Sequence, residues 1–269
     1  MRTCAALALL LLCRPGAAGA AELESPDGNV AVNVELNSAN GSDGRLVYSV
    51  AYQGKTIVAE SGLGLELDDG LLKHGLEIVE EKTSEQDGTW KPVYGERSTI
   101  RDHYRQLALT LRETGPPERS FQMVFRAYNE GAAFCYRIPR QSGKESVRIL
   151  REQTEFCFAE DHTAWAVYSA QGRYEEVPLK KIKPGCERPL VLRIDDGTYA
   201  AVAEARLVDY ARMKLAPLKD RPGSLVSALS SEVTARLPLT TPWRVVMVAD
   251  TPGLLLENND LILNLNDPC

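Results

Sequence analysis

The sequence predicts an all-β fold, a single large β-sandwich, and three observations support this prediction. Short runs in which apolar and polar residues alternate recur along the chain, and turn residues follow each run. No stretch shows a long apolar stripe with the period of a helix. The spacing of the runs implies roughly eighteen strands, more than an ordinary immunoglobulin-like sandwich contains. We therefore expect stacked sheets with about twice the usual number of strands.

The clearest element is a hairpin at residues 121–138. Residues 121–127 alternate with the two-residue period of a pleated strand, and residues 133–138 do so again. Asn129, Glu130 and Gly131 supply the turn between them, and Gly131 can adopt a positive φ. Because both faces of the hairpin carry apolar and aromatic residues, we expect it in the middle of the sandwich.

Further strands are expected along the rest of the chain, before and after this hairpin. They are residues 30–36, 46–52, 56–58, 63–67, 76–81, 107–112, 147–150, 155–158, 190–194, 199–203, 232–237, 243–248 and 261–265. Residues 203–215 are the best helical candidate, but their pattern fits a strand equally well. Arg244 is expected to form an ordinary salt bridge between strands. No linker rich in proline or serine interrupts the series, which favours one domain.

The first twenty residues are expected to be a secretory signal peptide. Met1-Arg2 is a basic start, residues 4–13 are apolar, and Ala18-Gly19-Ala20 is a small-residue cleavage pattern. The apolar run is too short to remain as a membrane anchor. The sequence therefore predicts a signal peptide at 1–20, one β-sandwich domain at 21–269, and a secreted or periplasmic location.

Charge and cysteine content narrow the functional classes. A formal net charge of −6 argues against nucleic-acid binding, which requires a basic face. No stretch after the signal peptide is long and apolar enough to cross a membrane. Four cysteines follow the signal peptide, namely Cys135, Cys157, Cys186 and Cys269. They allow three disulfide connectivities. Cys135 and Cys157 could meet across a sheet, and buried free thiols are an equal alternative.

An ordered series of short motifs carries a resemblance to a known family. The series reads ESPDGN at 24–29, YSV at 48–50, SGLGL at 61–65, WKPVYGE at 90–96, FRAYNEGAAFCYRIP at 125–139, EQTEF at 152–156, AW at 164–165, YE at 174–175, EA at 204–205, DYA at 209–211, TPWR at 241–244 and LNDPC at 265–269. In this order it resembles the N-terminal domain of glycoside hydrolase family 97. The resemblance covers essentially the whole chain after the signal peptide.

The resemblance implies a galactose-mutarotase-like super-sandwich and a role in carbohydrate chemistry. Members of that family are exported bacterial exo-acting α-glucosidases and α-galactosidases. Their catalytic carboxylates come from a (β/α)₈ barrel that follows this domain and is absent here. No catalytic residue is therefore assigned, and we expect no hydrolysis by this chain alone. The implied partners are a barrel, in cis or in trans, and α-linked gluco- or galacto-oligosaccharides.

The resemblance also implies site residues. It places a calcium-ligand glutamate at Glu175, because calcium takes six to eight oxygens and a neighbouring domain can share them. Calcium is expected only in complex with the barrel. Tyr174 and Trp165 are the candidates for contact with the sugar. The alternative for Glu175 is an ordinary exposed glutamate, and Glu176 is a second candidate for the ligand.

Two other functions remain open at this stage. The chain could be a stand-alone carbohydrate-binding module, which would need an exposed aromatic platform. It could also be a mutarotase-like enzyme, in which His103 or His162 would work with a glutamate as acid and base. Neither histidine lies in a family motif, and a shared fold does not by itself confer chemistry.

Overall fold

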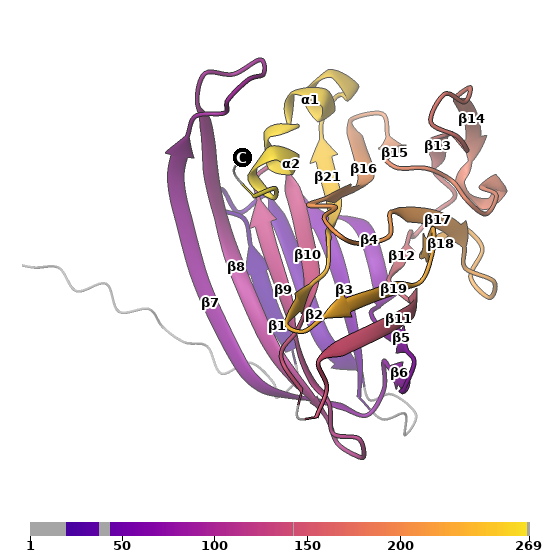
Figure 1. Ribbon diagram of the computed structural model, residues 1–269. Coiled ribbons are helices and arrows are strands. Elements are labelled where there is room, and N and C mark those ends of the chain that lie inside the picture. The colour runs from indigo at the N-terminus through magenta and orange to yellow at the C-terminus, as the bar shows by residue number, and fades with distance from the viewer. Residues whose placement is uncertain (1–19, 38–43, 142, 268–269) are drawn as a thin grey trace, which may run out of the picture.

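The computed structural model describes residues 20–37, 44–141 and 143–267, and these form three antiparallel sheets (Figure 1). The all-β prediction is confirmed. The predicted signal peptide lies outside the described residues except for Ala20, which begins the first strand. Within the described residues, no helix has the length and apolar character needed to cross a lipid bilayer.

One layer of the sandwich is a seven-stranded sheet with the order β1-β2-β3-β4-β12-β18-β17. Its strands are β1 (Ala20–Glu24), β2 (Val30–Asn37), β3 (Arg45–Tyr52), β4 (Lys55–Gly62), β12 (Glu155–Cys157), β18 (Ser224–Leu229) and β17 (Met213–Pro217). A smaller sheet of four strands has the order β19-β11-β5-β6. It contains β19 (Val233–Arg236), β11 (Ser146–Glu152), β5 (Leu65–Leu67) and β6 (Gly70–Leu72).

The other large layer is a ten-stranded sheet with the order β14-β13-β15-β16-β21-β10-β9-β8-β7, in which β20 also pairs with β10. Its strands are β14 (Glu175–Pro178), β13 (Thr163–Ala166), β15 (Leu190–Asp195), β16 (Thr198–Ala205), β21 (Trp243–Ala249), β10 (Gly131–Ile138), β9 (Ser120–Tyr128), β8 (Ile100–Glu113), β7 (Leu76–Trp90) and β20 (Leu239–Thr240). A short 3₁₀ helix, Leu179–Lys181, follows β14.

The predicted hairpin, β9–β10, lies in the interior of the ten-stranded sheet, between β8 and β21. Its inner face contributes Phe125 and Phe134 to the core, where the ring of Phe134 lies 4.7 Å from that of Tyr48 on the seven-stranded sheet. Gly131 begins β10 with φ 149°, and a Cβ there would lie 2.3 Å from the carbonyl oxygen of Val246. The position therefore requires glycine.

The outer face of the ten-stranded sheet is covered by two short helices, α1 (Pro252–Glu257) and α2 (Asp260–Asn264). Leu255, Leu261 and Leu265 pack onto this face. The strand predicted at residues 261–265 is therefore wrong. The Thr251 hydroxyl accepts a hydrogen bond from the Leu254 amide at 3.1 Å, and Pro252 fills the first turn, so the segment starts as a capped helix.

Two further sequence predictions have mixed outcomes. Residues 203–215 contain the end of β16 and the start of β17 with a loop between them, so the strand reading was the better one. Strands β7 and β8 are much longer than predicted, at 15 and 14 residues, and form a ribbon along one edge of the molecule (Figure 1). Most of β7 is exposed to solvent.

The described cysteines are not paired with one another. Cys135, Cys157 and Cys186 are free and buried, while Cys269 lies outside the described residues. Cys135 lies on the outer face of the ten-stranded sheet, whereas Cys157 belongs to β12 in the seven-stranded sheet. A bridge between these two is therefore wrong, and the buried-thiol alternative holds. Burial raises the pKa of the Cys135 thiol to about 11, which keeps it protonated at neutral pH.

Candidate functional site

The three predicted site residues lie on one small hairpin formed by β13 and β14, at an edge of the ten-stranded sheet. Trp165 is opposite Glu176, and Ala166 is opposite Glu175. Residues directly opposite in an antiparallel pair project to the same face. Trp165 therefore shares a face with Glu176, whereas Glu175 projects to the other face. The hairpin brings the residues close in the chain but does not turn Trp165 and Glu175 toward one point.

Tyr174 and Glu175 are both accessible. Tyr174 ends the loop before β14 with 59% of its surface exposed. The side chain of Glu175 is 48% exposed, and Lys183 Nζ lies 3.9 Å from its Oε2. An ion pair this long and this exposed contributes little free energy. The Glu175 carboxylate is thus available to another ligand.

The donor set fits a calcium ion only in part. A carboxylate is the hard oxygen donor that calcium prefers, and Glu175 supplies one. No group of three or more His, Cys, Asp or Glu residues in the described parts of the chain could hold a metal ion. Glu175 could therefore serve as one ligand in a shared site, with the remaining oxygens coming from outside these residues.

The two histidines of the mutarotase alternative are far apart in the sheet. His103 lies on β8, where its Nε2 is 3.0 Å from Glu85 Oε1 on β7. His162 is buried just before β13, and its ring meets Phe158 edge-on. Burial lowers the pKa of His162 despite the acidic residues around it. Strands β15, β16, β21, β10 and β9 separate β13 from β8, so these histidines do not form one acid–base centre.

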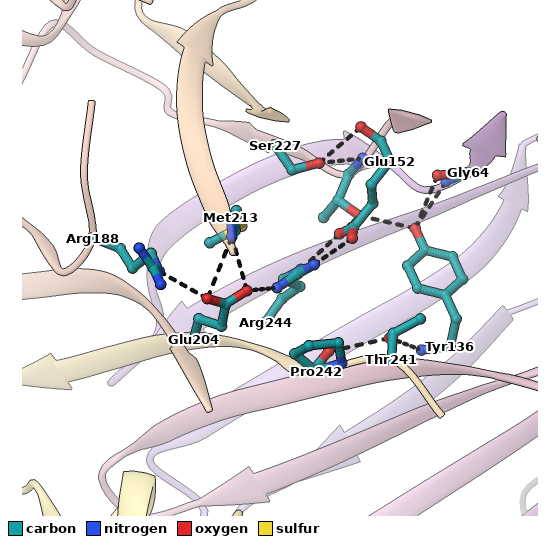
Figure 2. Close-up of polar contacts among 11 residues, drawn as sticks. Gly64, Tyr136, Glu152, Arg188, Glu204, Met213, Ser227, Thr241, Pro242 and Arg244 are labelled. Atoms are coloured by element: carbon teal, nitrogen blue, oxygen red, sulfur yellow. Dashed lines mark hydrogen bonds and ion pairs between the residues drawn. The ribbon is translucent and has the colours of Figure 1, made fainter. Parts of the chain in front are cut away.

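A buried ionic network ties the ten-stranded sheet to the four-stranded one (Figure 2). Arg244 on β21 is fully buried and donates from Nε to Glu152 Oε1 on β11 at 2.7 Å. Its Nη2 donates to Glu152 Oε2 and its Nη1 to Glu204 Oε1 on β16. The neighbouring carboxylates hold the pKa of Arg244 above its usual value even though burial opposes this. The expected inter-strand salt bridge of Arg244 is confirmed with Glu204.

Both carboxylates of this network have further partners. Glu204 Oε2 accepts from Arg188 Nε at 2.8 Å, and Glu204 Oε1 accepts from the Met213 amide at 3.1 Å. Glu152 Oε1 accepts from the Thr154 hydroxyl at 2.8 Å. Carboxylates with this many hydrogen-bond donors are held in fixed positions, so the network acts as a structural cross-link between the sheets.

Sequence reasoning missed a surface that the β7–β8 loop and the two helices form together. Arg97 in this loop donates from Nε to Asp260 Oδ1 and from Nη2 to the Glu257 carbonyl, both at 2.8 Å. Exposed apolar side chains gather on these segments, with Tyr94 at 84% and Leu256 at 79% exposure. The full set is Val93, Tyr94, Leu254, Leu256 and Leu263, and we name it the loop–helix platform.

The platform was missed because its parts lie about 160 positions apart in the chain, as the pairs made by Arg97 show. The WKPVYGE motif, which contains Val93 and Tyr94, was noticed only as part of the family resemblance. Two exposed apolar residues in a loop rich in turn-forming residues were the available signal.

Comparison with known proteins gives a consistent result. The family model for "Glycosyl-hydrolase 97 N-terminal" matches residues 23–268. The chain is 27% identical over 214 residues to a retaining alpha-galactosidase of Bacteroides thetaiotaomicron, which covers 72% of this chain and 30% of that protein. It is 26% identical over 215 residues to a probable retaining alpha-galactosidase of Streptomyces bingchenggensis, covering 78% of this chain and 33% of that protein.

A solved structure agrees with these matches. A glycoside hydrolase family 97 enzyme from Pseudoalteromonas sp. strain K8, in complex with acarbose, superimposes with a TM-score of 0.84 and 28% sequence identity. The match covers 92% of this chain and 38% of that enzyme. The chain thus spans roughly a third of the length of the relatives it matches.

Proposed function

Because the chain belongs to the glycosyl hydrolase 97 N-terminal family, we propose that it is the non-catalytic N-terminal β-sandwich domain of an exo-acting α-glycoside hydrolase. The proposal rests on the match of the family model to residues 23–268. The chain also spans only about a third of the length of the related enzymes. The proposed reaction class is that of an α-glucosidase or α-galactosidase. The proposed partner is a (β/α)₈ catalytic barrel, in cis or in trans, and the proposed location is outside the cytoplasm.

In this proposal the domain forms part of the wall of the sugar pocket. Glu175 would be one carboxylate ligand of a calcium ion shared with the barrel, which fits its accessibility and the hardness of its oxygens. The ion would supply positive charge beside the bound sugar. Tyr174, next to Glu175 in the chain, would contact the substrate, an α-linked gluco- or galacto-oligosaccharide. Trp165 would contact it only from the other face of the hairpin, opposite to Glu175.

The loop–helix platform supports the docking part of this proposal. Strongly exposed apolar side chains, such as Tyr94 and Leu256 on these two adjoining segments, are common where two domains pack. Arg97 holds the loop and the helices together, so the surface is preformed. We assign the platform to the contact with the barrel.

A chimaera tests the proposal. The matching N-terminal region of the Bacteroides thetaiotaomicron enzyme is replaced by this chain, and hydrolysis of p-nitrophenyl α-galactoside is measured. We expect activity from the chimaera and none from the isolated chain. Leu256→Glu on the platform should lower the activity at least tenfold, whereas Leu71→Glu, an exposed leucine on β6, should not.

Two results would contradict the proposal. Turnover by the isolated chain, lost on changing Glu175 to Gln, would place catalysis inside this domain. The second result is a folded chimaera with an intact barrel that hydrolyses the substrate no faster than the barrel alone. It would contradict the proposed role of this domain in shaping the pocket.

A further inference from the structure

A second concave site lies on the outer face of the ten-stranded sheet, away from the β13–β14 hairpin. It is a hollow of about 530 Å³, a size typical of small-molecule sites. Its floor comes from β7 to β10 with β20 and β21, and its wall from the chain that ends α2 and continues to Asp267. We name it the arginine hollow, because Arg126, Arg137 and Arg206 line it.

The wall of the hollow is fastened to the sheet. Asn264 Oδ1 accepts from Trp90 Nε1 on β7 at 2.7 Å, and Asn264 Nδ2 donates to the Arg101 carbonyl on β8 at 2.9 Å. Arg206, in a left-handed conformation with φ 56°, donates from its amide to Asn266 Oδ1 at 2.9 Å. These bonds join the C-terminal segment to three strands or their ends, so the hollow is preformed.

Arg126 is held in one orientation at the floor. Its guanidinium carbon lies 4.1 Å from the centre of the Tyr104 ring and 4.7 Å from that of Trp243. Its Nε donates to Gln106 Oε1 at 3.0 Å. A guanidinium fixed by two rings loses little side-chain entropy when it binds a ligand, and its planar fork matches a carboxylate.

The hollow carries more positive than negative charge, although the chain as a whole is acidic. Arg206 pairs with Asp267 at 2.9 Å. Among the described residues, no carboxylate lies within ion-pair distance of Arg126 or Arg137. Burial raises the pKa of Asp102, the other acid in the hollow, although Arg126 and a hydrogen bond from Tyr128 oppose the rise. Two half-buried cations thus line the hollow without a salt bridge at contact distance, although Asp102 acts on Arg126 from farther away, and the excess of positive charge favours an anionic ligand.

The remaining lining points to a hydroxylated ligand. Thr240, opposite Arg137 on the neighbouring strand, and Gln86 on β7 present a hydroxyl and an amide to the same space. Such groups exchange hydrogen bonds with sugar hydroxyls. We propose that the arginine hollow binds an acidic sugar, a hexuronate or a short uronate-terminated oligosaccharide, whose carboxylate pairs with Arg126 and Arg137. This site is separate from the one proposed for Glu175, so failure of either proposal leaves the other standing.

Tryptophan fluorescence of the purified chain provides a local readout, because Trp90 and Trp243 line the hollow whereas Trp165 lies on β13. The chain is titrated with sodium D-galacturonate, sodium D-glucuronate, D-galactose, D-glucose and sodium acetate at constant ionic strength. We expect saturable binding of at least one uronate, at least tenfold tighter than the matching neutral hexose and than acetate.

Variants locate the binding. Arg137→Gln should weaken uronate binding at least fivefold, and Arg126→Lys should weaken it too, because lysine keeps the charge but lacks the planar fork. Arg148→Gln is the matched control, since this exposed arginine pairs with Glu232 outside the hollow. Circular dichroism checks that each variant is folded.

Several outcomes would overturn the proposal. They are the absence of saturable uronate binding, neutral hexoses or acetate binding as tightly as the uronates, and uronate binding that Arg137→Gln and Arg126→Lys leave unchanged. If Arg137→Gln does not fold, Arg126→Lys alone decides the question.

Discussion

Replacing Arg244 by methionine should be among the most damaging single changes in this domain. Arg244 is fully buried and provides two donors to Glu152 and one to Glu204. Without it, Glu204 keeps Arg188 and the Met213 amide, but Glu152 keeps only the Thr154 hydroxyl. A buried carboxylate would then lack a counter-charge, which costs about 3–5 kcal/mol of the free energy of unfolding.

The double variant Glu152→Gln with Arg244→Met separates lost charge pairing from lost packing. It removes the carboxylate that Arg244→Met leaves unpaired, so about half of the loss or more, roughly 2 kcal/mol, should be recovered. The measurement is urea unfolding followed by far-ultraviolet circular dichroism, with the midpoint and slope compared among variants.

Arg148→Met is the matched control. Arg148 and Glu232 form an exposed pair, at 53% and 50% side-chain exposure, so its loss should cost less than about 1 kcal/mol. The reasoning is refuted if Arg244→Met costs no more than this control, or if the double variant is no more stable than Arg244→Met alone.

Three further predictions concern the turn, a tyrosine and calcium. Gly131→Ala should destabilise the fold by about 1–3 kcal/mol, because its Cβ would meet the Val246 carbonyl at 2.3 Å; thermal unfolding measures this, and an unchanged melting temperature would contradict it. Burial, and then the hydrogen bond to Asp250, raise the pKa of Tyr52 to about 12. Because the pKa of Tyr52 is higher in the folded state than the unfolded value of 10.0, the protonated hydroxyl stabilises the fold fully below pH 10, and this contribution is lost as the pH rises toward 12. Absorbance titration at alkaline pH measures the pKa of Tyr52. A value near 10 would disprove the prediction. The isolated chain should bind calcium at millimolar concentration or more weakly, because Glu175 offers one carboxylate; micromolar affinity in calorimetry would rule this out.

The sequence was informative where apolar residues alternate and uninformative where they do not. The hairpin at residues 121–138 was predicted with its turn, because both of its strands are buried and their pattern is set by the core. The length of β7 was not predictable, because residues 79–87 are exposed and mostly polar and carry no apolar period. Helix α2 was read as a strand, because five residues are too few to separate the two periods.

The candidate site, too, could be predicted from the sequence only in part. Tyr174 and Glu175 were predicted as site residues from a resemblance, and the structure adds that they are exposed and that Glu175 faces away from Trp165. The partners of Arg244 were not identifiable, because Glu152 and Glu204 lie 92 and 40 positions away in the chain and carry no local signal. Contacts of this kind depend on sheet order and register, which are set by the packing of the whole domain.

The exposed edge strand β7 bears on whether two copies of this domain can join through their sheets. In the described structure β7 is the last strand of its sheet and pairs only with β8, so one row of its amides and carbonyls is open. Such a row is a template on which another chain could add a strand. Glu80, Glu81, Glu85 and Asp87 stand along it with a single lysine, Lys82, among them. Joining two such edges would bring the charged side chains of both copies out of water, so polymerisation through this border is discouraged.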